Sequence, residues 1–419
     1  MLISFSVKNF LSFKDEASIS LVPLPDKTLG KQNVHALDLK GLPGLLKVAA
    51  IYGPNAGGKT NLLKAMHAFL QVIMESTTGP IARKLPNEAF ALDEKSRELP
   101  SEFQAVFIFG GQKYQYGFSI TIDRVFSESL SVYLSSKPSL LFSRTCNEDG
   151  TQHYSYGLGL MGPKKIWEKS TRQNALYLST AAQLNSELLG GLQRHFGSSW
   201  MFARGGTPTP EYTVDYIKSK QAAERVVALM RAADTGIGGI SFRKQKGGQI
   251  EFEVTDREDL PVPKMQMIER DLPIFSHRSE TVQADIEFED ESDGTQKFFG
   301  LAGIFLEILE QGSIAFVDEL DRSLHPHLVR KIVEMFNDPQ SNPNGAQLVF
   351  TTHDTTLLDP ELLRRDQIWF TEKDRNQASS LYSLADISVR KNEAFAKGYL
   401  SGRYGALPAL EKFRPLEKH

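Results

Sequence analysis

The sequence predicts an α/β fold in which short apolar strands alternate with amphipathic helices around a parallel sheet. Three observations support this class. The apolar run 46–52 ends in a glycine-rich loop, and a helical pattern follows over residues 59–74. A second apolar run, 314–317, ends in two carboxylates, and a third, 348–350, leads into Thr351-Thr352-His353-Asp354. Polar groups at the ends of several buried strands predict a functional site at one edge of the sheet.

Composition limits the possible classes of protein. The chain has 419 residues, enough for two or three ordinary domains or for one large α/β domain with insertions. It carries 48 Lys plus Arg against 51 Asp plus Glu, so binding of nucleic acid is expected only through a local patch or a partner. The single cysteine argues against disulfides and a thiolate metal cluster, and is typical of the reducing cytoplasm. The sequence shows no signal peptide and no apolar run of about 20 residues, so we expect no membrane contact.

The glycine-rich loop matches G-x-x-x-x-G-K-[ST] at every fixed position and lies between a buried strand and a helix, as this motif requires. Backbone N–H groups of such a loop surround the β- and γ-phosphates of a nucleotide. Lys59 supplies a positive charge, and the Thr60 hydroxyl can bind Mg²⁺. The loop therefore predicts ATP and Mg²⁺ as cofactors. The predicted nucleotide-binding residues here are Gly53, Pro54, Asn55, Ala56, Gly57, Gly58, Lys59, Thr60 and Asn61.

The acidic pair and the downstream histidine supply the groups that hydrolysis of a phosphate needs. Asp318, at the end of its strand, can hold Mg²⁺ together with Thr60. Glu319 is then placed to accept a proton from the attacking water. His353 can orient that water and, with Lys59, stabilise charge on the γ-phosphate. The alternatives are a solvated strand-to-helix turn for the carboxylates and an ordinary loop histidine.

A serine–glycine segment, 291–297, precedes an apolar helix. Ser292 suits the start of that helix, and Gly294 would let the backbone approach a ligand. On local evidence the segment is simply a helix start.

The order of these segments resembles the ATP-binding-cassette (ABC) ATPases of the SMC/RecF branch. The resemblance implies a P-loop ABC-type ATPase core with a β-rich N-terminal lobe and an inserted helical region. It also implies that Ser292 and Gly294 contact the γ-phosphate bound by a second copy, which makes an ATP-sandwiched homodimer or a higher homo-oligomer. Asp321 begins a segment that looks like the D-loop at the dimer seam, and it joins the predicted nucleotide-binding set.

A closer resemblance is to the bacterial abortive-infection (AbiL/RloA-type) ATPase family, and it covers essentially the whole chain. It implies defence against phage, together with a separately encoded effector that is often a nuclease. Two departures concern Leu11, where related proteins often have arginine, and the glutamine loop, for which Gln104 and Gln183 are candidates. The segments that carry the resemblance are 9–13, 291–295, 318–326, 351–354, 365–370 and 398–405.

The motif order predicts an organisation in three segments. Residues 1–75 and 271–419 form the two halves of the ATPase core, and residues 76–270 are inserted between them. Within the insertion we expect a hairpin at Gly110-Gly111, mainly helical structure over 160–235, and a second hairpin at Gly247-Gly248. The proline-containing stretch 255–273 reads as a linker.

Two other functions fit the same motifs. One is a RecF-like repair ATPase that acts directly on DNA; the other is a scaffold that binds ATP and scarcely hydrolyses it. The stretch 164–172 mixes basic residues with Trp167 and could contact a nucleic-acid backbone, although such stretches are more often solvated helix faces. Arg243, Lys244 and Lys246 form a weaker candidate patch.

Overall fold

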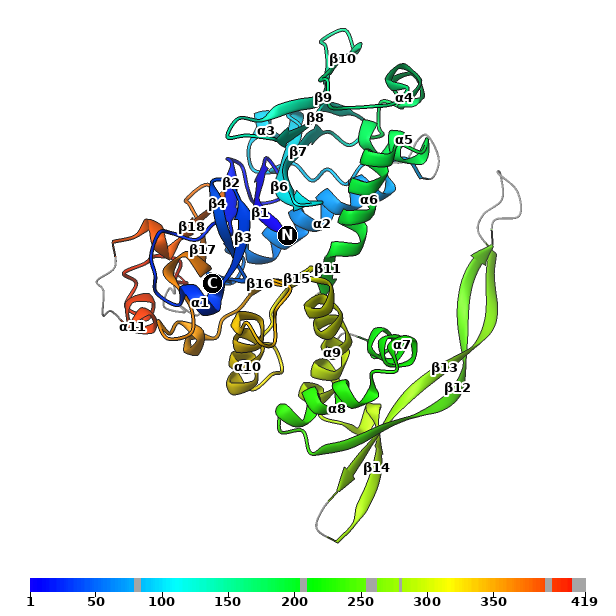
Figure 1. The fold of residues 1–419 in the computed structure, drawn as a ribbon, viewed down its shortest axis with the longest axis vertical. Helices are drawn as coiled ribbons and strands as arrows, with labels where there is room; N and C mark the ends of the chain where they lie inside the picture. The colour runs from blue at the N-terminus through cyan, green and yellow to red at the C-terminus, as the bar shows by residue number, and fades with distance from the viewer. Residues whose placement is uncertain (79–83, 204–208, 254–261, 279–280, 389–393, 409–419) are drawn as a thin grey trace, which may run out of the picture. The chain divides into compact units, whose positions relative to one another are not determined.

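A computed structural model describes residues 1–78, 84–203, 209–253, 262–278, 281–388 and 394–408, with the backbone alone over 247–253 and 262–268. The chain divides into two compact units (Figure 1). Unit 1 holds Met1–Ala203, Ile308–Asp321 and Val329–His419, and unit 2 holds Arg204–Glu307 and Arg322–Leu328. The segment 76–270 therefore contributes to both units, and its independence as an insertion stays a prediction.

A six-stranded sheet forms the base of the candidate site in unit 1. The first five strands are parallel and the last is antiparallel to its neighbour. Its central strands are buried along their whole length, which is typical of a parallel sheet and confirms the predicted α/β class. In spatial order the strands are β11 (Trp200–Ala203), β15 (Ile314–Val317), β16 (Gln347–Thr351), β5 (Val48–Tyr52), β17 (Ile368–Lys373) and β18 (Ser379–Ser383).

The strand order brings distant parts of the sequence together. Strand β16 lies between β5 and β15, and all three run in the same direction. Their carboxyl ends therefore meet at one edge of the sheet, where ligands bind in open α/β sheets. The residues that follow these strands are Gly53, Asp318 and Thr352.

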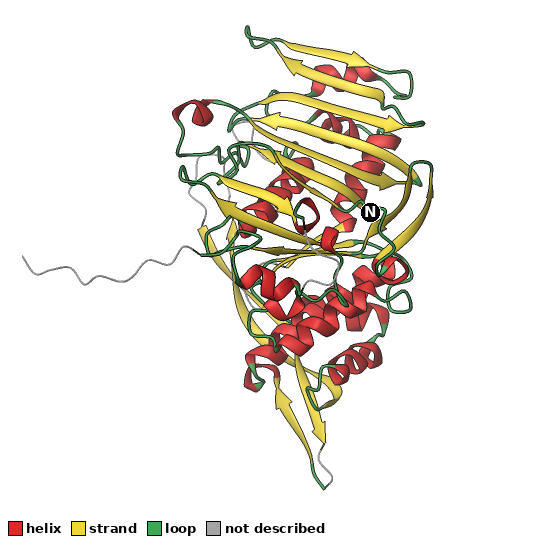
Figure 2. Ribbon diagram, turned by 90° about the vertical axis from the view of Figure 1, so that its left-hand side faces the viewer, coloured by secondary structure: helices red, strands yellow, loops and turns green. Residues whose placement is uncertain are grey.

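A seven-stranded antiparallel sheet forms the β-rich lobe of unit 1, as predicted. Figure 2 shows its strands side by side with helices behind them. The hairpin between β6 and β7 is confirmed, since Gly110 and Gly111 both have positive φ (56° and 74°). In spatial order the strands are β10 (Gln152–Tyr156), β9 (Ser139–Cys146), β8 (Val125–Tyr133), β7 (Gln112–Ile120), β6 (Ser101–Phe109), β1 (Leu2–Lys8) and β2 (Ala17–Ser20).

Helix α2 (Lys59–Glu75) joins the two sheets of unit 1 through an aromatic core. The Phe69 ring stacks on Phe118 of β7 at 5.2 Å and lies 5.5 Å from Trp200 of β11. Aromatic pairs of this kind stabilise a core beyond the area they bury. The phosphate-loop helix is therefore fixed along its length. Two further helices, α5 (Tyr177–Gln183) and α6 (Glu187–Ser199), lead into β11.

Helices over 160–235 are confirmed, but the sequence did not predict β11, which interrupts them. This strand has four residues and begins directly after α6, so its apolar pattern is too short to stand out. It pairs in parallel with β15. The pairing places Ala203, at the carboxyl end of β11, beside Asp318, whose backbone N–H donates to the Ala203 carbonyl (3.2 Å).

Unit 2 contains a long antiparallel ribbon where a hairpin and a linker were predicted. Strand β12 (Ile237–Glu253) runs without a turn through Gly247-Gly248, so that prediction was wrong. Its partner β13 (Val262–Arg278) occupies most of the predicted linker. Pro263 and Pro273 fit there because β14 (Gln283–Glu287) pairs only with 274–278 among the described residues, which leaves the outer edge of 262–273 open.

Helices α7 (Glu211–Lys220), α8 (Ala223–Ala232) and most of α9 (Asp293–Gln311) belong to unit 2. The Thr213 hydroxyl on α7 donates to the Phe299 carbonyl of α9 (2.7 Å). The remaining α-helices and strands of the described residues are α1 (Gly30–Asn33), β3 (Val34–Leu39), β4 (Leu42–Leu46), α3 (Glu94–Glu98), α4 (Lys164–Ser170), α10 (Pro326–Asn337) and α11 (Phe395–Leu400). Within the described parts of the chain, no helix has the length and apolar character needed to cross a bilayer.

Candidate functional site

The phosphate loop connects β5 to α2 and depends on glycine at both ends. Gly53 has φ 153° and Gly58 has φ 115°. A Cβ on Gly53 would lie 2.3 Å from the Thr371 carbonyl oxygen, and one on Gly58 would lie 2.5 Å from the Ser379 hydroxyl oxygen. The loop therefore passes closely over β17 and β18, and any side chain at these two positions would push it away.

Lys59 lies beneath this loop and is only 6% exposed. Its ammonium group donates to the carbonyls of Gly53 (2.9 Å) and Pro54 (3.1 Å). Burial lowers the pKa of Lys59, while Asp318, Glu319 and Asp321 act in the opposite direction. Asn55, Ala56 and Thr60 are exposed, so this part of the loop faces solvent, whereas Lys59 is buried.

The predicted metal ligands lie together at the carboxyl edge of the sheet. The Thr60 hydroxyl, on the first turn of α2, donates to the Asp318 carboxylate (3.2 Å). The Thr351 hydroxyl, at the end of β16, donates to the same carboxylate oxygen (2.6 Å). Hydroxyl and carboxylate oxygens suit a hard cation such as Mg²⁺. Among the described residues no group of three or more His, Cys, Asp or Glu could hold a metal. A cation here would need hydroxyl and ligand oxygens as well.

Glu319 follows Asp318 with an unusual backbone. Its φ is 49°, the left-handed region that residues other than glycine seldom adopt. The Glu319 N–H donates to the Thr351 hydroxyl (2.7 Å), which holds the chain in this turn. Thr351 thus contacts both acidic residues, through its hydroxyl, from the neighbouring strand. Residues kept in such conformations cluster at functional sites.

His353 lies two residues beyond β16 with an exposed side chain. Its backbone N–H donates to the Asp321 carboxylate (3.1 Å). Partial burial and then the charge of Lys59 lower the pKa of His353, against the smaller opposing effects of Asp321 and Glu319. The ring is therefore neutral near pH 7, and its nitrogens can accept as well as donate a hydrogen bond.

Ser292 and Gly294 belong to unit 2, where they start α9. The exposed Ser292 hydroxyl accepts from the Thr295 N–H (3.2 Å), which makes Ser292 the cap of the helix. A Cβ on Gly294 would lie 2.8 Å from the Ser323 carbonyl oxygen. The serine–glycine segment therefore packs on residues of the D-loop-like segment within the same unit.

Sequence reasoning missed the residues that support the phosphate loop from below. The Ser379 hydroxyl donates to the Gly57 carbonyl (2.9 Å) and lies 2.8 Å from the Ser12 hydroxyl oxygen. The Asn61 side-chain amide donates to Ser12 (2.8 Å). Ser12 lies in the segment 9–13, one of those on which the family resemblance rests, but the sequence analysis assigned this serine no function. Ser379 had no local signal, because only the pairing of β18 with β17 brings it under the loop.

The two basic stretches do not expose an aromatic side chain for stacking on bases. Trp167 on α4 is 2% exposed, and Lys165 forms an ion pair with Glu168 (2.8 Å). Arg243 and Lys244 form ion pairs with Glu287 and Glu269. Of the glutamine-loop candidates, Gln104 lies in the middle of β6 and Gln183 ends α5.

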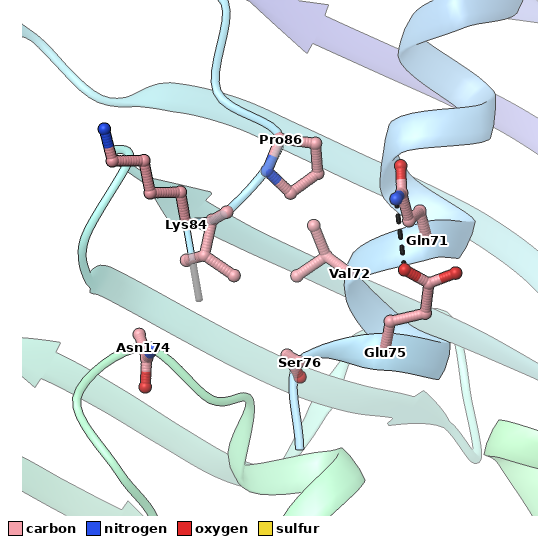
Figure 3. Close-up of a pocket in the computed structure, with 8 residues that line it drawn as sticks. Gln71, Val72, Glu75, Ser76, Lys84, Pro86 and Asn174 are labelled. Carbon is pink, nitrogen blue, oxygen red and sulfur yellow. Dashed lines mark hydrogen bonds between the residues drawn. The ribbon is translucent and has the colours of Figure 1, made fainter. Parts of the chain in front are cut away.

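A cavity of about 90 Å³ lies at the far end of α2 from Lys59 (Figure 3). Gln71 donates to Glu75 at its wall (3.1 Å). This cavity is too small for a nucleotide and has no phosphate-loop residue in its wall. Its lining residues are Gln71, Val72, Glu75, Ser76, Lys84, Leu85, Pro86 and Asn174.

Comparison with known proteins gives one family. A family model described as "AAA domain, putative AbiEii toxin, Type IV TA system" matches residues 48–359. The structure is similar to the SMC head domain from Thermotoga maritima, at 15% identity and a TM-score of 0.40, over 93% of this chain and 99% of that chain. No curated protein sequence matches the chain. Because the family match spans most of the chain, from β5 through His353, the protein belongs to this AAA-domain family and contains an AAA-type ATPase domain.

Proposed function

We propose that this protein is a Mg²⁺-dependent ATPase of the SMC/RecF-like class that uses ATP binding and hydrolysis to control its dimerisation and a partner effector. The observation that carries the proposal is the convergence of Lys59, Thr60 and Asp318 at the carboxyl edge of the six-stranded sheet. Thr60 and Asp318 lie within 3.2 Å of each other although 258 positions separate them in the sequence. A phosphate loop, a buried lysine and a strand-end carboxylate are the parts that ATP hydrolysis requires.

The residues present fit ATP and Mg²⁺. Gly53 and Gly58 let the loop pass closely over Thr371 and Ser379, where a Cβ would clash, and backbone N–H groups of such a loop can surround phosphate oxygens. Thr60 and Asp318 would hold Mg²⁺, which supplies positive charge to the phosphates when bound. Lys59 would exchange the carbonyls of Gly53 and Pro54 for phosphate oxygens.

The chemical step follows from the two remaining groups. Glu319 accepts a proton from the water that attacks the γ-phosphorus, and the bond from that phosphorus to the bridging oxygen of ADP breaks. The neutral His353 ring orients this water and donates to the γ-phosphate. The products are ADP and inorganic phosphate.

Dimerisation uses the exposed start of α9. Ser292 is exposed at the N-terminus of a 19-residue helix, where the helix dipole and free N–H groups favour an anion. We place Ser292 and Gly294 of one copy on the γ-phosphate bound by another, so that hydrolysis separates the two. The family description names a toxin of a toxin–antitoxin system, which supports a partner protein. We propose that the protein acts with this partner in defence against phage, in the cytoplasm.

The test is Glu319→Gln, measured by phosphate release and by sedimentation with ATP and Mg²⁺. Phosphate release should fall at least a hundredfold, as expected for loss of a general base (about 10²–10⁴), and an ATP-bound dimer should accumulate. Glu361→Gln, at an exposed position outside the site, is the control and should match the parent. Release at the parent rate by Glu319→Gln would contradict the assigned base. A parent that binds ATP and releases almost no phosphate would favour the scaffold, and ATP-dependent DNA binding by the isolated protein would favour the repair ATPase.

A further inference from the structure

Tyr52 connects the phosphate loop to the His353 segment. It is the last residue of β5, directly precedes Gly53 and is fully buried. Its hydroxyl donates to the backbone carbonyl of Asp354 (3.1 Å), the residue after His353. Since Asp321 accepts from the His353 N–H, the His353 segment is held by hydrogen bonds on both sides.

The C-terminal part of the chain fixes the Tyr52 ring. Tyr399 of α11 meets this ring edge-on at 5.9 Å, and Phe370 of β17 lies 6.2 Å from it. Phe370 in turn stacks on Tyr399 at 5.4 Å and lies 6.0 Å from Tyr404. All four rings are at most 7% exposed, so Tyr52 has little room to turn.

This packing explains the glycine-rich segment 398–405, to which the sequence analysis assigned no role. A Cβ on Gly398 would lie 2.2 Å from the Tyr404 hydroxyl oxygen. Gly405 has φ 72°, and a Cβ there would lie 2.6 Å from the Tyr382 hydroxyl oxygen. The Ala396 N–H of α11, two residues before this segment, donates to the Leu358 carbonyl (3.2 Å), so α11 also holds the chain beyond His353.

We propose that Tyr52 is a positioning residue that sets His353 relative to the phosphate loop, and that residues 395–406 keep Tyr52 in place. The inference rests on the proposed ATPase function. The hydrogen bond joins Tyr52, at the end of β5, to Asp354, which follows His353 beyond the end of the neighbouring strand β16. A shift of either strand end would therefore move His353 relative to the phosphate loop. Burial raises the pKa of Tyr52 well above its usual value, so the hydroxyl remains a donor throughout the working pH range.

The experiment compares Tyr52→Phe with Tyr133→Phe in the full chain. Tyr133, on β8 of the seven-stranded sheet and outside the candidate site, is the control because its hydroxyl also donates a hydrogen bond, to the Gln115 side-chain oxygen (2.6 Å). Tyr52→Phe should lower kcat for ATP about three- to tenfold, the range of one lost hydrogen bond, and should change KM less than twofold. Tyr133→Phe should leave kcat within twofold of the parent.

A double variant separates positioning from general stability. Because Tyr52 acts through His353, Tyr52→Phe should cause no further loss of kcat in a His353→Ala background. An equal loss in both backgrounds, or an equal loss for Tyr133→Phe, would overturn the proposal. Hydrogen exchange gives a readout without hydrolysis: Tyr52→Phe, unlike Tyr133→Phe, should speed amide exchange over 352–358. If the parent releases no phosphate, the ATPase proposal fails. The positioning role is tested separately: parent-like amide exchange over 352–358 in Tyr52→Phe would overturn it.

Discussion

The phosphate loop rests on a short chain of hydrogen bonds that runs from Asn61 through Ser12 and Ser379 to the Gly57 carbonyl. The Asn61 amide donates to Ser12, the Ser12 and Ser379 hydroxyl oxygens lie 2.8 Å apart, and Ser379 donates to the Gly57 carbonyl (2.9 Å). Ser379 is 6% exposed, so water has little access to replace its hydroxyl. Ser379→Ala removes one oxygen from the middle of this chain without adding an atom.

The expected cost follows from the groups that lose a partner. A buried acceptor left without a donor costs about 1–3 kcal/mol, and here it is the Gly57 carbonyl. We take about 2 kcal/mol as the loss for the loop in its binding conformation. Because about 1.4 kcal/mol corresponds to a tenfold change in affinity, ATP binding should weaken by up to about 30-fold. Loss of this hydrogen bond in Ser379→Ala should also lower the free energy of unfolding.

The assay is an equilibrium titration with a fluorescent ATP analogue, followed by denaturant unfolding. Ser380→Ala is the control, since Ser380 is exposed and the hydrogen bond from its hydroxyl to the Glu372 carbonyl is long (3.4 Å). That variant should stay within about 0.5 kcal/mol of the parent, as is usual for surface changes. Parent-like ATP affinity in Ser379→Ala, or equal losses in both variants, would refute the reasoning.

Two further predictions concern Gly53 and Lys47, the residues on either side of strand β5. Gly53→Ala places a Cβ 2.3 Å from the Thr371 carbonyl oxygen, so the titration should show ATP binding weakened at least about a hundredfold. Gly30→Ala, where a Cβ meets nothing within 4 Å, should bind normally. Lys47 is buried, which lowers its pKa from 10.5 to about 8. Between these values the unfolded chain binds more protons, so unfolding measured at pH 8 and pH 10 should show the parent gaining stability relative to Lys47→Met. Equal pH slopes would contradict this.

Prediction from sequence succeeded for the strand, loop and helix around the glycine-rich motif, because these features are local. The phosphate loop needs glycine for its positive φ values and a lysine at a fixed spacing, and both are visible in eight consecutive residues. It failed at Gly247-Gly248, because glycine suits an extended strand as well as a turn and the distant strand β13 decides between them. It also missed β11, because this four-residue strand is defined by its pairing with the distant strand β15.

The sequence by itself determined the α/β class, the phosphate loop, and the carboxylates and histidine that follow the central strands. These features depend on side-chain type and on short spacing, which a linear sequence displays directly. Only the tertiary structure decided that Thr60 lies beside Asp318, that Ser12 and Ser379 support the loop, and that Tyr52 holds the His353 segment. Strand order produces these contacts: β16 lies between β5 and β15, and β18 pairs beyond β17. Such pairings join residues hundreds of positions apart, and the free energy that selects them comes from the packed sheet as a whole.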